Sequence, residues 1–268
     1  MLSLIEKAVA KAKSSAERKP AEMPVDVQLR VNSRSVDREP STAAIEAQTM
    51  ERNKIMPAVD DKAAVAAYKV LRTRALQRMR SNQWRTVVVT AADAQEGKTL
   101  TACNLAVSIA KDVNQSVFLV DLDLQHPSIS DYFGLDIQAG IGEFLTGAAE
   151  FDDVIYSPEG LDRIFVIPNR APVENASELI ASPRMKILLK RISEHSGKPY
   201  AIFDMPPVLA CDDVLAFLPS VDSLLFVVSE GNTQRSRLAK AVEMLGNVNL
   251  LGVVLNRSRE LRRASSYY

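Results

Sequence analysis

Residues 85–99 contain the feature that most restricts what this chain can fold into. They read Arg85-Thr-Val-Val-Val-Thr-Ala-Ala-Asp-Ala-Gln-Glu-Gly-Lys-Thr99. The β-branched run Val87-Val88-Val89 predicts a strand that is buried on both faces, and a short loop, residues 91–96, follows it. From Gly97-Lys98-Thr99 onward, apolar residues recur every three or four positions, which is typical of a helix. A buried strand, a tight loop and a helix that begins with Gly-Lys-Thr together predict a phosphate-binding loop.

In such a loop, the backbone amides and the first turn of the helix face one point and bind phosphate oxygens. We expect the Lys98 ammonium to contact the β- and γ-phosphates of a nucleotide and the Thr99 hydroxyl to bind Mg²⁺. Ala92 replaces the first glycine of the usual pattern G-x-x-x-x-G-K-[ST], and it can make the same turn if its φ stays negative. The predicted nucleotide-binding residues of the loop are Ala92, Asp93, Ala94, Gln95, Glu96, Gly97, Lys98, Thr99 and Leu100.

Three aspartates follow two further apolar runs. Val117–Val120 predicts a second buried strand that ends in Asp121-Leu122-Asp123, and alternation places both carboxylates on one side of the extended chain. Tyr200-Ala-Ile-Phe-Asp204 predicts another strand, which Pro206-Pro207 ends abruptly. Carboxylates at the carboxyl ends of parallel strands lie where open α/β sheets bind ligands, so they can bind Mg²⁺ and accept a proton. The alternative for Asp121 and Asp123 is that they only cap the following turn.

Strands and helices alternate along the rest of residues 61–257, where strands are predicted at residues 163–168, 223–229 and 250–256 and helices at 63–80, 175–195 and 233–245. This alternation predicts an α/β fold, a P-loop NTPase with a mostly parallel, doubly wound sheet flanked by helices. Residues 1–60 are expected to form a flexible extension with a short amphipathic helix at 2–14, because the linker from residue 15 to about 60 has few apolar residues. Residues 258–268 are predicted to be a mobile tail.

Bulk composition excludes several classes of protein. Lys plus Arg and Asp plus Glu both number 33, so the formal net charge of zero gives no support for nucleic-acid binding. Cys103 and Cys211 have neither zinc nor redox-pair spacing and suggest buried thiols in a reducing compartment. Because the start of the chain is too charged for a signal peptide and no apolar run is long enough for a membrane span, we expect a cytoplasmic protein.

Three elements in this order resemble the Walker A, Walker A′ and Walker B motifs of the bacterial tyrosine kinases (BY-kinases) of capsule and exopolysaccharide loci. They are Ala92-x₄-Gly97-Lys98-Thr99, then Phe118-Leu-Val-Asp121-Leu-Asp123, then Ile202-Phe-Asp204-Met-Pro-Pro207. The resemblance covers about residues 63–256. The opening Ser3-Leu-Ile-Glu-Lys-Ala8 is similar to the start of the exosortase-associated branch of that family.

The resemblance implies autophosphorylation of C-terminal tyrosines with ATP and Mg²⁺, here Tyr267 and Tyr268, often between the subunits of a ring. It implies Lys98, Asp121, Asp123 and Asp204 as catalytic residues, with Asp121 or Asp123 as the base, and Thr99, Asp121 and Asp204 as the Mg²⁺ site. Asn256 is implied as an adenine contact. A membrane chain-length regulator of polysaccharide export is the implied activating partner, which would recruit the kinase to the inner face of the membrane, and a tyrosine phosphatase is the implied antagonist.

The chain departs from the family pattern at several positions. Gln125 replaces a basic residue of the A′ motif, and Ala66-x-x-Lys69-x-x-Arg72 replaces the Glu-x-x-Arg-x-x-Arg assembly motif. Two other functions therefore stay open, a ParA/MinD-like ATPase and a non-catalytic nucleotide-binding scaffold of an export complex. The ParA/MinD group carries an extra lysine early in its P-loop, where this chain has Asp93.

Overall fold

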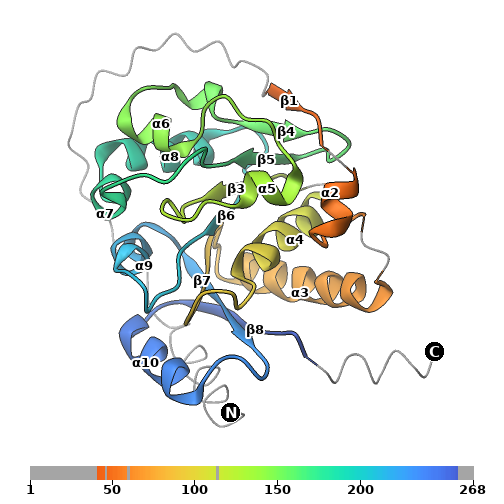
Figure 1. Cartoon of the computed structure of the whole chain (residues 1–268), viewed down its shortest axis with the longest axis vertical. Coiled ribbons are helices and arrows are strands. Elements are labelled where there is room, and N and C mark those ends of the chain that lie inside the picture. Colours follow the sequence, from red (N-terminus) through yellow and green to blue (C-terminus); the bar gives the residue numbers. More distant parts are fainter. Residues whose placement is uncertain (1–40, 46, 59–60, 113–114, 259–268) are drawn as a thin grey trace.

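The structure, a computed structural model, describes residues 41–45, 47–58, 61–112 and 115–258. They form an eight-stranded sheet with the strand order β1-β4-β5-β3-β6-β2-β7-β8 (Figure 1). Neighbouring strands are parallel, except that β4 and β5 are antiparallel. The strands are β1 (Ser41–Ala43), β2 (Thr86–Ala91), β3 (Val117–Asp121), β4 (Tyr156–Pro158), β5 (Ile164–Ile167), β6 (Tyr200–Asp204), β7 (Ser223–Ser229) and β8 (Leu250–Asn256). The prediction of a mostly parallel sheet is confirmed.

Helices cover both faces of the sheet, as the continuous apolar runs of its central strands require (Figure 1). In β2, Val87 and Val89 point into one core, while Val88 points into the other. The first core is closed by α2 (Ala47–Arg52), α3 (Lys62–Ser81), α4 (Lys98–Ala110) and α5 (Ile129–Phe133). The second is closed by α6 (Ile141–Thr146), α7 (Ala176–Ile180), α8 (Pro183–Glu194), α9 (Asp213–Phe217) and α10 (Arg235–Leu245). The sheet is therefore doubly wound, as predicted.

The α4 helix is the central helix of the first core, because all its residues except Leu100 are buried. Its buried polar side chains have partners on other segments. Asn104 accepts a hydrogen bond from the Met56 amide (2.8 Å) and donates one to the Lys54 carbonyl (3.0 Å). The helix that follows the phosphate loop is thus fixed to the chain that precedes α3.

The prediction of a flexible linker as far as about residue 60 is wrong for the described residues between 41 and 58. β1 pairs with β4, and Met50, Ile55 and Met56 are buried in the first core. The large apolar residues of this segment are few, but each of these three is buried in the core, and Asn104 pairs with the backbone of the segment. The amphipathic helix predicted at residues 2–14 lies outside the described residues.

The single helix expected over residues 175–195 is two helices, α7 and α8. Pro183 is the first residue of α8, and the Ser182 hydroxyl accepts a hydrogen bond from the Met185 amide, so a new helix begins there. Both cysteines are free thiols, Cys103 buried and Cys211 partly exposed. In the part of the chain that the structure describes, no helix is both long and apolar enough to span a membrane.

Candidate active site

The loop between β2 and α4 has the backbone shape of a phosphate-binding loop. Gly97, directly before α4, has φ +91°, and Gln95 also has a left-handed φ of 61°. Ala92 keeps a negative φ, as its replacement of glycine requires. The left-handed positions of the loop are therefore Gln95 and Gly97, and alanine at position 92 is compatible with the turn.

Side chains at the end of β8 and on α10 form hydrogen bonds with this loop. Asn256, the last residue of β8, donates from Nδ2 to the Glu96 carbonyl (2.9 Å). Arg257 donates to the Gln95 carbonyl (2.9 Å), and Asp93 forms a two-pronged ion pair with Arg237 of α10. Asn256, an expected adenine contact, thus lies against the loop itself, and its role toward adenine stays a prediction.

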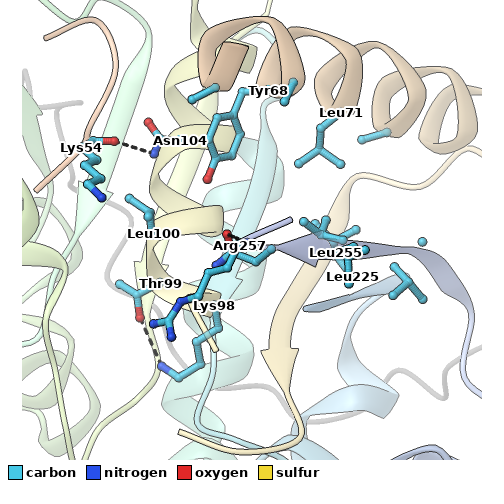
Figure 2. A pocket seen from close by; sticks show the side chains of 18 of the residues that line it. Lys54, Tyr68, Leu71, Lys98, Thr99, Leu100, Asn104, Leu225, Leu255 and Arg257 are labelled. Atoms are coloured by element: carbon cyan, nitrogen blue, oxygen red, sulfur yellow. Dashed lines mark hydrogen bonds between the residues drawn. The ribbon is translucent and has the colours of Figure 1, made fainter. Parts of the chain in front are cut away.

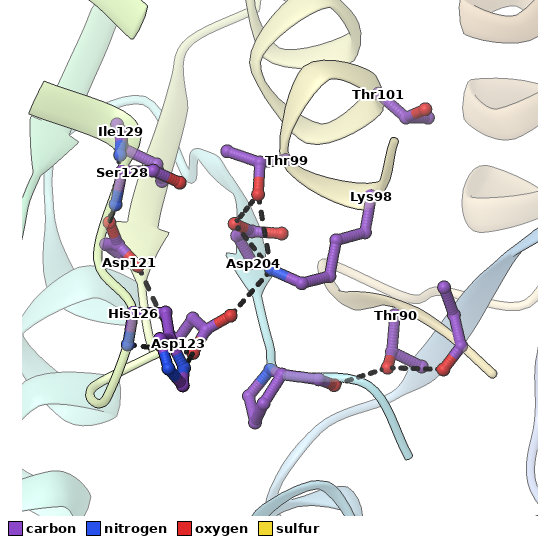
Figure 3. A network of polar contacts seen from close by, with 12 residues as sticks. Thr90, Lys98, Thr99, Thr101, Asp121, Asp123, His126, Ser128, Ile129 and Asp204 are labelled. Atoms are coloured by element: carbon purple, nitrogen blue, oxygen red, sulfur yellow. Dashed lines mark hydrogen bonds and ion pairs between the residues drawn. The ribbon is translucent and has the colours of Figure 1, made fainter. Parts of the chain in front are cut away.

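Lys98, Thr99, Asp123 and Asp204 meet in one buried cluster at the carboxyl ends of β2, β3 and β6 (Figure 3). The Lys98 ammonium lies 2.8 Å from Asp123 Oδ2 and 3.5 Å from Asp204 Oδ2. The Thr99 hydroxyl donates to Asp204 Oδ2 at 2.6 Å. Asp121 and Asp204 are register partners in the sheet, and this pairing brings together aspartates that are 83 positions apart.

Asp121 has a different environment from Asp123. Its Oδ2 accepts hydrogen bonds from the amides of Ser128 and Ile129, both at 3.0 Å, and its Oδ1 accepts one from the Asp123 amide at 3.3 Å. Asp123 Oδ1 in turn accepts a hydrogen bond from the His126 amide at 3.2 Å. Both aspartates therefore cap the turn after β3, as the alternative holds, although both are buried rather than on the surface. Of the two A′ acids, Asp123 is the one that contacts Lys98.

The charges of the cluster shift its ionisation. Burial raises the pKa of Asp121 to about 7, and the nearby Asp204 adds to this rise. Burial also raises the pKa of Asp204, although Lys98 and the Thr99 hydroxyl oppose the change. Burial by itself would lower the pKa of Lys98, but the attraction of Asp204 and Asp123 outweighs this and raises it. Lys98 is therefore a fixed cation that compensates for neighbouring buried carboxylates.

The cluster fits a magnesium ion that also binds phosphate and water. In the described part of the chain, Asp204 Oδ1 is buried and accepts no hydrogen bond, so it is available to a metal-bound water. No group of three or more His, Cys, Asp or Glu residues among those described could hold a metal alone. Mg²⁺ sites in proteins commonly use one or two carboxylates together with substrate phosphates.

A groove of about 2320 Å³ opens from this cluster and runs between α3 and β8 (Figure 2). Lys98, Thr99 and Leu100 form one end, and Tyr68 and Leu71 of α3 face Leu225 and Leu255 of the sheet across it. Arg257 and Ser258, the last described residues, also line it. No short sequence motif contains Asn104, Arg257 or Tyr68, so their places beside this groove come only from the tertiary structure.

The departures at Gln125, Ala66 and Lys69 lie on the surface, whereas Ala92 is buried. Gln125 is exposed beside His126, whose ring Nδ1 is 3.8 Å from Asp123 Oδ1. Ala66 and Lys69 lie on the exposed side of α3, whereas Arg72 is half-buried and donates to the Ser108 carbonyl (3.0 Å). Tyr267 and Tyr268, the predicted phosphoacceptors, lie outside the described residues.

Comparison with known proteins supports the nucleotide-binding reading of this geometry. The model of the CobQ/CobB/MinD/ParA nucleotide-binding domain family matches residues 87–267. The tyrosine-protein kinase YwqD of Bacillus subtilis is 29% identical over 221 residues, which cover 81% of this chain and 91% of YwqD.

The chain is also similar to a solved kinase domain and to part of a longer protein. The kinase domain of the Escherichia coli tyrosine kinase Etk superimposes with a TM-score of 0.68 at 31% identity, over 74% of this chain and 78% of that domain. The succinoglycan biosynthesis transport protein ExoP of Rhizobium meliloti is 28% identical over 71% of this chain. The chain spans only 25% of ExoP and 30% of full-length Etk, so it matches one part of each.

Proposed function

Because the chain belongs to the CobQ/CobB/MinD/ParA nucleotide-binding family and, within it, to the bacterial tyrosine kinases, we propose that it is an ATP-dependent protein-tyrosine autokinase. The observation that carries the proposal is the buried contact of Lys98 with both Asp123 and Asp204 beside the phosphate loop. One cation and two carboxylates are thereby held where the phosphates of a nucleotide and an attacking hydroxyl would meet.

Each residue of the cluster has a proposed role. The amides of the loop bind the phosphates of ATP, and Lys98 contacts the β- and γ-phosphates. Thr99 and Asp204, which are hydrogen-bonded to each other, would hold Mg²⁺, which would supply neutralisation of charge on the phosphates. Asp123 borders the groove and accepts the proton of the tyrosine hydroxyl, while Asp121 positions the turn that carries Asp123.

The proposed acceptors are Tyr267 and Tyr268. The described chain ends at Ser258 in the wall of the groove, and ten residues follow, which can span about 33 Å when extended. The tyrosines can therefore reach a nucleotide site of their own subunit or that of a neighbouring copy in a homo-oligomer. Tyr156 is a poorer acceptor, because it is buried with its hydroxyl bonded to the Ala139 carbonyl, and Tyr200 is buried as well.

We place this activity in exopolysaccharide biosynthesis and export, as the name of ExoP suggests. The proposed setting is the inner face of the cell membrane, where a membrane chain-length regulator recruits and activates the cytoplasmic kinase. A tyrosine phosphatase would reverse the modification.

Mass spectrometry of the C-terminal peptide after incubation with Mg²⁺-ATP tests the proposal. Phosphate is expected on Tyr267 or Tyr268 of the wild type. It is expected to be absent in Lys98→Met, strongly reduced in Asp123→Asn, and absent from the tail of the double variant Tyr267→Phe/Tyr268→Phe. Nucleotide binding without transfer, even with the cytoplasmic segment of the cognate membrane protein added, would favour a scaffold. ATP hydrolysis with no phosphotyrosine would favour a ParA/MinD-like ATPase.

A further inference from the structure

Glu96 is a carboxylate within the phosphate loop that does not face the phosphate site. Its side chain is buried, with the residue only 1% exposed, and both of its oxygens have partners. Oε2 accepts a hydrogen bond from the Ala92 amide at 3.2 Å. Oε1 accepts one from the Thr233 hydroxyl at 2.7 Å. A negative charge beside phosphates would weaken their binding, so this burial and pairing require a structural reason.

Thr233 links the loop to the connection between β7 and α10. Its hydroxyl oxygen accepts a hydrogen bond from the Ser229 amide at 2.8 Å while its proton goes to Glu96. Because an ionised carboxylate can only accept, threonine is the donor and Glu96 the acceptor in this bond. The two residues are 137 positions apart, so the bond depends on the order of strands in the sheet.

The two bonds of Glu96 close the loop on itself. The Ala92–Glu96 bond joins the first residue of the loop to the fifth, at the position where alanine replaces glycine. The Glu96 carbonyl is held separately by Asn256. The side chain of Glu96 is thus held by the connection between β7 and α10, and its backbone by the last residue of β8. Gly97 follows directly, and α4 begins at Lys98.

We propose that Glu96 and Thr233 are positioning residues that preorganise the phosphate loop for nucleotide. The carboxylate holds the Ala92 turn, and the threonine hydroxyl fixes the carboxylate. Neither side chain contacts the nucleotide. The inference rests on the proposed binding of Mg²⁺-ATP at this loop and is independent of whether tyrosine is the acceptor.

A matched pair of variants separates the hydroxyl from the shape of the side chain. Thr233→Val keeps the volume and removes both the donor to Glu96 and the acceptor of the Ser229 amide, whereas Thr233→Ser keeps both. Hydrogen bonds to charged groups are the stronger ones, so we expect Thr233→Val to raise the Kd for a non-hydrolysable Mg²⁺-ATP analogue about tenfold. Thr233→Ser should retain most of the affinity. Hydrogen exchange of the peptide over residues 86–100, without nucleotide, should be faster in Thr233→Val than in Thr233→Ser.

A second variant acts at the carboxylate itself. Glu96→Gln preserves the shape but replaces one of the two acceptor oxygens by an amide NH₂, so either the Ala92 amide loses its acceptor or Thr233 must turn from donor to acceptor. We expect a weaker affinity for the analogue with little change in the apo melting temperature. Arg237→Gln, which removes the α10 guanidinium that pairs with Asp93 at the surface of the loop, should have a smaller effect, because exposed ion pairs contribute little.

Equal Kd values for Thr233→Val and Thr233→Ser, with equal hydrogen exchange, would overturn the inference. So would a fall in apo stability with unchanged affinity, since that result marks an ordinary packing role. If the wild type binds the analogue but forms no phosphotyrosine, the proposed kinase function fails and these comparisons still decide the role of Glu96 and Thr233. If the wild type binds no analogue, unchanged hydrogen exchange in Glu96→Gln would refute preorganisation.

Discussion

The contact between Gly97 and Asn256 allows a quantitative test of how the phosphate loop is held. A Cβ at residue 97 would lie 2.0 Å from Asn256 Nδ2, and the backbone there has φ +91°. Gly97→Ala therefore has two separate costs. A left-handed conformation costs a non-glycine residue about 1–2 kcal/mol. Displacement of Asn256 breaks its bond to the Glu96 carbonyl, which contributes about 0.5–1.5 kcal/mol.

The sum predicts that Gly97→Ala lowers the free energy of unfolding by about 1.5–3.5 kcal/mol before one correction. Alanine also restricts the unfolded chain, which offsets about 0.4–1 kcal/mol of that loss. Urea unfolding of the apo protein, analysed by linear extrapolation, measures the difference. Binding of Mg²⁺-ATP should weaken as well, because the loop amides next to Gly97 shift.

A double-mutant cycle with Asn256→Ala separates the two costs. The atoms that the new Cβ would approach within 4 Å both belong to Asn256, so in the Asn256→Ala background only the backbone cost should remain. The unfolded-state correction is the same in both backgrounds and cancels. The coupling should therefore be about 0.5–1.5 kcal/mol. The same destabilisation in both backgrounds would show that Asn256 is not displaced, and the account of the Asn256 contact would be wrong.

Three further predictions concern the rest of the domain. Ile55→Ala should lower the free energy of unfolding by about 2–5 kcal/mol in urea denaturation, because Ile55 is fully buried; a loss below about 0.5 kcal/mol would mean that this segment is not part of the core. Asn104→Ala should lower the free energy of unfolding by about 1–3 kcal/mol in the same assay, because the Met56 amide and the Lys54 carbonyl both lose their hydrogen-bond partner. Hydrogen exchange at the Met56 amide should be faster for the same reason. The pKa of Asp121 is raised above its unfolded value of 3.8 to about 7, so the folded apo protein binds the extra proton in this window. Its contribution to stability should therefore fall as pH rises from about 4 to about 7, by up to about 1.4 kcal/mol per pH unit. Chemical denaturation across that range measures the slope, and an equal slope in Asp121→Asn would contradict the assignment.

Local patterns in the sequence predicted the strands of the sheet centre and the position of the phosphate loop. The runs at Val87–Val89, Val117–Val120 and Tyr200–Asp204 are apolar on both faces, which is a property of a buried parallel strand. Since parallel strands end at one edge, the sequence also predicted that Lys98, Asp123 and Asp204 would gather there. The contacts of Lys98 with both aspartates agree with that expectation.

The tertiary structure decided the features that depend on residues far apart in the chain. Composition indicated a linker at residues 41–58, but a few apolar side chains and Asn104 fix most of that segment to α4 and the core. Alternation placed Asp121 and Asp123 together, yet the amides of Ser128 and Ile129 bind Oδ2 of Asp121, the Asp123 amide binds its Oδ1, and Asp123 is the one that contacts Lys98. Local periodicity follows from the backbone geometry of single helices and strands. Which strand ends become neighbours is set by the packing of the whole sheet, and those neighbours hold the phosphate loop in place.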